Sequence, residues 1–183
     1  MYHRSRYGDF GNTNTPADEY VAGKTQYFYI VALEHTARFA ARVGQTSDAQ
    51  RYQGLAAAAR ELYTARLCNA PVGNRSCFGN CTYPGQIFGL SLDVLPRGGA
   101  EEAAAWAHVL AEIGPHATNP ANANRFGGGI VTLKLIYPLF QRFGEAALAL
   151  RTLLHTDRSP SLGFMTTQGG AGPGDTGTTL HEA

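Results

Sequence analysis

Apolar residues recur at three- and four-residue steps along most of the chain, as they do on one face of an α-helix. A helix predicted from about Ser47 to Leu67 has an apolar stripe of Tyr52, Leu55, Ala56, Ala59, Leu62, Tyr63 and Leu67. Its other stripe carries Arg51, Gln53, Arg60 and Glu61. Residues 27–33 are instead apolar nearly all round, which predicts a helix enclosed by others. β-branched residues and two-residue alternation are too scarce for a sheet, so the pattern predicts an all-α fold.

Helix start and stop signals divide the chain into three helical hairpins, at about residues 16–67, 84–114 and 129–155. Thr15-Pro16 is typical of a helix start, and Ser47 with Gln50 has the spacing of a capping box. Turns of about one to four residues are expected at Gly44, Pro96–Gly99 and Gly144. The pattern also places Ala103, Trp106, Ala107, Leu110 and Ile113 on one helix face. Pro138 lies inside the fifth helix, where we expect a kink or a break.

The links between hairpins are much longer than the turns within them. They comprise residues 69–83, 115–128 and 156–178, and residues 1–14 form a further polar segment. In consecutive antiparallel pairs the long links all lie at one end, which we expect to be the functional end. Three hairpins with enclosed odd-numbered helices would form an arc whose two ends stay open.

Composition excludes several classes of function. The 15 Lys+Arg nearly balance the 14 Asp+Glu, giving a net charge of +1, so no nucleic-acid partner is expected. No apolar stretch has the roughly 20 residues of a membrane span, and no apolar signal-peptide core follows Met1. No metal site or cofactor motif is found, because the six histidines are scattered. Composition leaves oligomeric state and cellular location open. It also leaves open whether Cys68, Cys77 and Cys81 form a disulfide and whether Asn74 or Asn80 is glycosylated.

Carboxylates at the predicted functional end are few, namely Asp9, Asp157, Asp175 and Glu182. Hydrolysis of a glycosidic bond uses two carboxyl groups, and Asp9 with Glu182 is one possible pair. The alternative for each acid is a helix cap, a turn residue or a solvated charge. Aromatic residues at the same end could stack on a sugar ring or fill the core: Tyr7, Phe10, Phe78, Tyr83, Phe126 and Phe164.

Several ordered segments resemble the catalytic domain of bacterial-type α-L-rhamnosidases, which is an (α/α)6 toroid of six hairpins. Tyr7–Phe10 resembles the family's Gly-Asp-Trp segment, Gly85–Pro96 its helix ending in Leu-Val-Pro, and Gly128–Lys134 its glycine-led fifth helix. Pro160–Met165 is similar to the family's Pro-Ser-Trp-Gly-Tyr-Met, and Thr178–Glu182 to its Thr-Thr-hydrophobic-Trp-Glu. The resemblance covers residues 7 to 182.

The resemblance implies an inverting glycoside hydrolase that releases terminal L-rhamnose from a carbohydrate substrate. It implies Glu182 as the general base and Asp9 as a group that binds hydroxyls or tunes charge. Phe10, Phe164 and His181 would form the walls of the sugar pocket. Phe10, Leu162 and His181 stand where the family has Trp, and residues 169–175 resemble an inserted loop.

The family takes its general acid from an acidic motif upstream of the Gly-Asp-Trp segment, and here only six residues precede Tyr7. We therefore expect residues 1–183 to be a single partial domain, roughly half of the toroid, without the general acid and incomplete or inactive alone. One alternative is a non-catalytic helical module that binds carbohydrate or protein. The other is a different six-hairpin glycoside hydrolase, because a fold of this kind hosts many substrates.

Overall fold

The computed structural model describes residues 17–67, 78, 82–126 and 129–155. Their regular structure consists of six α-helices and one short 3₁₀ helix: α1 (Ala17–Arg42), α2 (Thr46–Leu67), α3 (Tyr83–Ser91), α4 (Ala100–Ile113), η1 (Pro120–Asn122), α5 (Gly129–Arg142) and α6 (Ala146–Leu154). No β-strand occurs within these ranges. The all-α prediction is confirmed.

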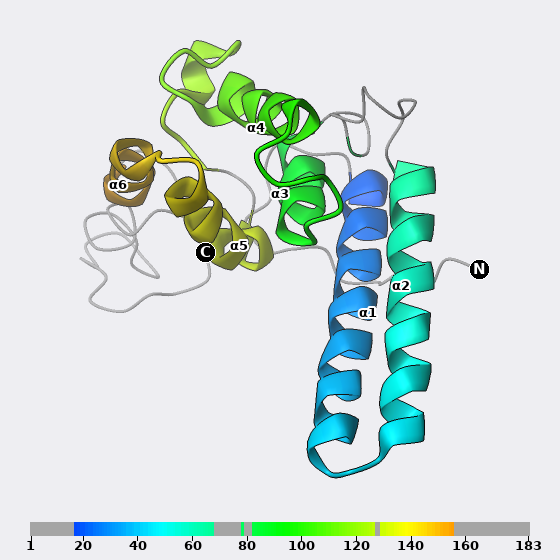
Figure 1. Ribbon diagram of the computed structural model, residues 1–183. Helices are drawn as coiled ribbons and strands as arrows, with labels where there is room; N and C mark the ends of the chain where they lie inside the picture. Colours follow the sequence, from blue (N-terminus) through cyan, green and yellow to red (C-terminus); the bar gives the residue numbers. More distant parts are fainter. Residues whose placement is uncertain (1–16, 68–77, 79–81, 127–128, 156–183) are drawn as a thin grey trace, which may run out of the picture.

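The helices pack as three successive hairpins, α1 with α2, α3 with α4, and α5 with α6. The odd-numbered helices also contact one another in sequence, α1 against α3 and α3 against α5. Figure 1 shows the green α3 between the blue α1 and the olive α5, with α2 along the far side of α1. The odd helices thus form a row and the even helices flank it, as expected for roughly half of an (α/α)6 toroid.

Burial shows which odd helix is enclosed. Residues 86–90 of α3 are all buried, because α1, α4 and α5 surround this helix. In α1, by contrast, Phe28 is 37% and Tyr29 is 51% exposed. The prediction that residues 27–33 are enclosed was therefore wrong, since among the described elements α1 packs mainly against α2 and α3.

Two of the three hairpin turns use the same backbone device. Gly44 and Gly144 have φ of 78° and 74°, the left-handed region that glycine enters without a steric penalty. The next residue donates its N–H back into the helix in both, Gln45 to the Ala40 carbonyl at 2.9 Å and Glu145 to the Phe140 carbonyl at 2.8 Å. α2 begins at Thr46, so Ser47 lies inside the helix and the predicted capping box is wrong.

The α3–α4 turn differs from the other two and is longer than predicted. α3 ends at Ser91 and α4 begins at Ala100, which leaves eight residues, 92–99, between them. Asp93 takes a left-handed φ of 53°, a conformation that Asp tolerates better than most residues. The apolar run extends to Leu95, but its last residues pack from a turn rather than from a helix.

Helix α5 is continuous through Pro138, so the proline does not break it as one alternative predicted. Proline lacks an N–H, and the Lys134 carbonyl four residues earlier therefore loses its usual helical donor. Lys134 and Pro138 are both exposed and share one face of α5, where this loss is cheapest.

The apolar stripes of the even helices agree with their predicted positions only in part. In α2 Ala56, Ala59 and Tyr63 of the predicted stripe are buried, while Leu55 and Leu62 are 41% and 43% exposed. In α4 the buried residues are Glu102, Ala105, Trp106, Val109 and Ile113, whereas Ala103 and Ala107 are exposed. Periodicity gave the helices correctly but not the angle at which each meets its partner.

Candidate functional site

The predicted site residues, Glu182, Asp9, Phe10, Phe164 and His181, all lie outside the described residues. Their roles stay predictions from the resemblance. The described residues form the helical scaffold and fix the points from which the long links leave it.

The link between α4 and α5 lies against the end of α6. Arg125 Nε donates to His155 Nε2 at 3.1 Å, and Arg151 Nε donates to Asn124 Oδ1 at 3.0 Å. The link also folds back on α4, because the Asn124 N–H donates to the Ile113 carbonyl at 3.0 Å. The segment that follows α6 therefore starts beside the α4–α5 link, which supports the expectation that the long links gather at one end.

Phe78 anchors the link between α2 and α3. Its backbone N–H donates to Gln86 Oε1 at 3.3 Å, and its carbonyl accepts from Gln86 Nε2 at 3.2 Å. Its ring lies against Gly89, where an added Cβ would come within 2.5 Å of it, and its carbonyl lies equally close to a Cβ at Gly85. The ring also meets Tyr63 of α2, with centroids 5.9 Å apart. Two glycines one helical turn apart thus make the groove that fixes this link.

The described aromatic residues near the long links fill the core and do not form a sugar platform. Phe78 is 0%, Tyr83 is 2% and Phe126 is 6% exposed. Tyr83 and Phe126 pack edge to face with centroids 5.9 Å apart. Of the two interpretations open at these positions, core filling is the correct one.

A pocket of about 510 Å³ opens where α1, the α3–α4 turn and α5 meet. Its apolar lining comes from Tyr27, Leu135, Pro138 and Leu139. Its polar lining comes from Ser91, Asp93, Arg97, Gln141 and Arg142. A second groove, of about 380 Å³, lies between α1 and α2. It is lined by three alanines and by the polar residues Glu34, Arg38, Gln53 and Arg60.

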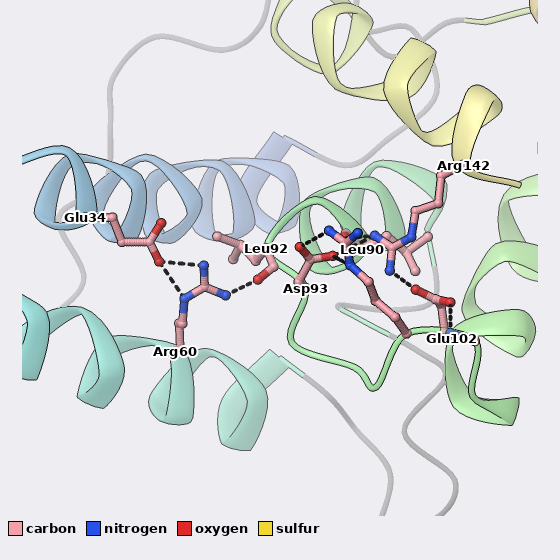
Figure 2. A network of polar contacts seen from close by, with 9 residues as sticks. Glu34, Arg60, Leu90, Leu92, Asp93, Glu102 and Arg142 are labelled. Carbon is pink, nitrogen blue, oxygen red and sulfur yellow. Dashed lines mark hydrogen bonds and ion pairs between the residues drawn. The ribbon is translucent and has the colours of Figure 1, made fainter. Parts of the chain in front are cut away.

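Arg142, the last residue of α5, ties the third hairpin to the second (Figure 2). Its guanidinium donates to the Leu90 carbonyl at 3.1 Å and to Asp93 Oδ1 at 2.7 Å, and it pairs with the buried Glu102 of α4. Glu102 Oε2 in turn accepts the N–H of Gly98 at 2.7 Å. One side chain therefore joins the end of α5, the end of α3 and the start of α4.

Arg60 plays a similar part on the other side of α3 (Figure 2). It pairs with Glu34 of α1 at 2.5 Å and also donates to the Leu92 carbonyl. Arginines from α2 and α5 thus hold the carboxyl end of α3 from both sides. Charge-assisted bonds to main-chain carbonyls are stronger than neutral ones.

Asp93 stands at the centre of the α3–α4 turn. Arg97 contacts both of its oxygens, at 3.2 and 2.6 Å, and Arg142 contacts one of them. Burial alone would raise the pKa of Asp93, but the hydrogen bonds and positive charges of Arg97 and Arg142 lower the pKa below its ordinary value of 3.8. Asp93 is thereby kept ionised.

Sequence reasoning did not single out this polar network. The four-residue spacing of Asp93 and Arg97 was a signal that could have been used, because such pairs interact on a helix or a tight turn. The contacts of Arg142 with Asp93 and Glu102 join residues 49 and 40 positions apart, and no local pattern points to them.

Within the described ranges, no group of three His, Cys, Asp or Glu side chains could hold a metal ion. None of the described helices is both long and apolar enough to span a membrane.

Comparisons with known proteins agree with this architecture. Residues 1–174 match the model of the bacterial alpha-L-rhamnosidase 6 hairpin glycosidase domain. Among solved structures, the alpha-L-rhamnosidase from Dictyoglumus thermophilum is similar, with a TM-score of 0.73, 16% sequence identity and 90% of this chain covered. The chain spans 18% of the length of that enzyme. The curated proteins contain no match.

Proposed function

Because this chain belongs to the family of bacterial α-L-rhamnosidase six-hairpin glycosidase domains, we propose that it contributes to the inverting hydrolysis of terminal α-L-rhamnosides. The observation that carries the proposal is the family match over residues 1–174. The row of odd helices, with the α4–α5 link lying against the end of α6, agrees with a domain of this kind.

The proposed chemistry assigns Glu182 as the general base that activates water. Inversion requires a second, protonated carboxyl group about 6.5–9.5 Å away, so that water fits between base and sugar. We assign Asp9 to the sugar hydroxyls, and Phe10, Phe164 and His181 to the pocket walls. Asp9, Phe10 and Phe164 lie within the matched range, and His181 and Glu182 follow it.

The first test is Glu182→Gln in the natural protein that carries this chain. Removing a general base lowers the rate by about 10²- to 10⁴-fold, and we expect that loss in kcat for release of an aryl α-L-rhamnoside. The matched control is Glu61→Gln, an exposed glutamate on α2, whose rate should equal that of the wild type. Proton NMR of the first product should show the β anomer.

Four results would contradict parts of this assignment. An unchanged rate in Glu182→Gln would show that Glu182 is not the general base. Release of the α anomer would show that the reaction does not invert. Hydrolysis of another aryl glycoside in place of the rhamnoside would favour a different six-hairpin hydrolase, and sugar binding without hydrolysis would favour a binding module.

A further inference from the structure

The pocket at the junction of α1, the α3–α4 turn and α5 lies beside the carboxyl end of α3. α3 ends at Ser91, and Arg142 at the end of α5 reaches the Leu90 carbonyl there. The left-handed Asp93 then turns the chain toward α4. The pocket is lined by Tyr27 from α1 and by Leu135 and Pro138 from α5.

The apolar part of the lining is held in place by packing. Tyr27 is fixed against Phe88, with ring centroids 5.4 Å apart, and Leu139 is 3% exposed. Pro138 adds a flat ring. This part of the lining therefore offers apolar contact.

The polar part of the lining comes from the α3–α4 turn and the end of α5. Arg97 and Arg142 both contact Asp93 there, Arg142 also pairs with Glu102 outside the lining, and these contacts fix their orientation. The Arg97 side chain remains 70% exposed beside them. Ser91 and Gln141, which line the pocket without belonging to the ion pairs described, add a hydroxyl and an amide. A site whose charged groups are already paired and that offers both donors and acceptors suits a neutral polyhydroxylated ligand better than an ion.

We propose that this pocket binds a neutral monosaccharide or the terminal sugar of an oligosaccharide. A sugar ring presents C–H groups on one face and hydroxyls that both donate and accept, which matches a lining that combines apolar and hydrogen-bonding groups. Its volume of about 510 Å³ falls within the roughly 300–1,000 Å³ of small-molecule sites. The binding groups are not the residues assigned to catalysis, so the inference rests on the proposed function only for the choice of sugar.

The test is a titration of the ¹⁵N-labelled chain with L-rhamnose, followed by NMR. We expect shifts at the side-chain amide of Gln141 and the backbone amide of Ser91. Gln141→Ala, which removes an exposed side chain, should weaken binding roughly 2- to 10-fold, the effect of one lost hydrogen bond. Ser91→Ala tests the other wall in the same way, and Gln50→Ala, an exposed glutamine on α2 outside the pocket, is the matched control.

Shifts confined to other residues, or no shift at any sugar concentration, would overturn the proposal. A parallel titration with sodium sulfate separates an anion site from a sugar site, and sulfate-induced shifts without sugar-induced ones would also overturn it. Glu182→Gln, expected to abolish hydrolysis, should leave the shifts at Gln141 unchanged. Failure of the catalytic assignment is thus distinguishable from failure of this inference.

Discussion

At the scale of single residues, the position of Phe78 depends on its contact with Gly89. Phe78 is fully buried, and its ring occupies the space that a Cβ on Gly89 would need. Gly54 in α2 offers the opposite case, because no atom lies within 4 Å of an added Cβ there. The same substitution therefore has opposite consequences at the two positions.

We predict that Gly89→Ala lowers the free energy of unfolding by about 1–3 kcal/mol, because a tightly packed neighbour must move. Gly54→Ala should raise it by about 0.5–1 kcal/mol, since alanine loses less entropy in a helix. Urea unfolding followed by circular dichroism measures both. In the double variant Gly89→Ala/Phe78→Ala, the loss of unfolding free energy should be smaller than the sum of the losses in the two single variants. Equal values would show that the Phe78 ring is not what opposes a Cβ at position 89.

At the scale of elements, the three hairpin turns follow two designs. The turns at Gly44 and Gly144 need only a left-handed glycine, and both are short. The α3–α4 turn instead depends on the ionised Asp93 and its two arginines. Its stability should therefore depend on pH, whereas the hydrogen bonds described for the other two turns join main-chain groups only.

The sign of this pH dependence follows from the lowered pKa of Asp93. A carboxyl group whose pKa is lower in the folded state stabilises that state above its unfolded pKa and loses the effect as pH falls through the folded pKa. We predict that wild-type stability falls more steeply than that of Asp93→Asn when the pH is lowered from 5 towards 2. Asparagine tolerates the left-handed backbone, so the comparison isolates the charge. Parallel urea-unfolding curves for the two proteins would contradict the prediction.

At the scale of the whole molecule, polar contacts and stacked rings join hairpins that have no short connection in sequence. Trp106 of α4 stacks on Phe143, just beyond α5, with centroids 4.5 Å apart, and Arg142 reaches Glu102 beside it. Glu102 is 5% exposed in its side chain, so its charge depends on that partner. These contacts add to the packing of α3 against α5 in holding the second and third hairpins together.

We predict that Arg142→Met lowers the free energy of unfolding by about 3–5 kcal/mol, the cost of breaking a buried pair from one side. Arg97→Met is the matched control and should change stability only slightly, because its side chain is 70% exposed. Replacing Glu102 by Gln in the Arg142→Met background should recover part of the loss. Equal effects of the two single variants would show that the buried pair does not hold the hairpins together.

Local sequence was sufficient for the helices, because the 3.6-residue period and glycine stop signals act within one or two turns. It placed the hairpin turns at Gly44 and Gly144, and it indicated the family through ordered motifs such as Gly85–Pro96. It did not give the rotation of α2 and α4, or the exposure of Phe28 and Tyr29, because these depend on which neighbours each helix meets.

The sequence by itself determined that this chain is helical, that its helices form pairs and that it is related to a six-hairpin glycosidase. Short-range periodicity and the order of the motifs are sufficient to indicate these properties. The tertiary structure alone decided that α3 is the enclosed helix, that Phe78 and Phe126 fill the core, and that Arg142 meets Asp93 and Glu102. The physical reason is that burial and ion pairing depend on distances in space, and the packing of one hairpin on the next brings together residues 40 or more positions apart.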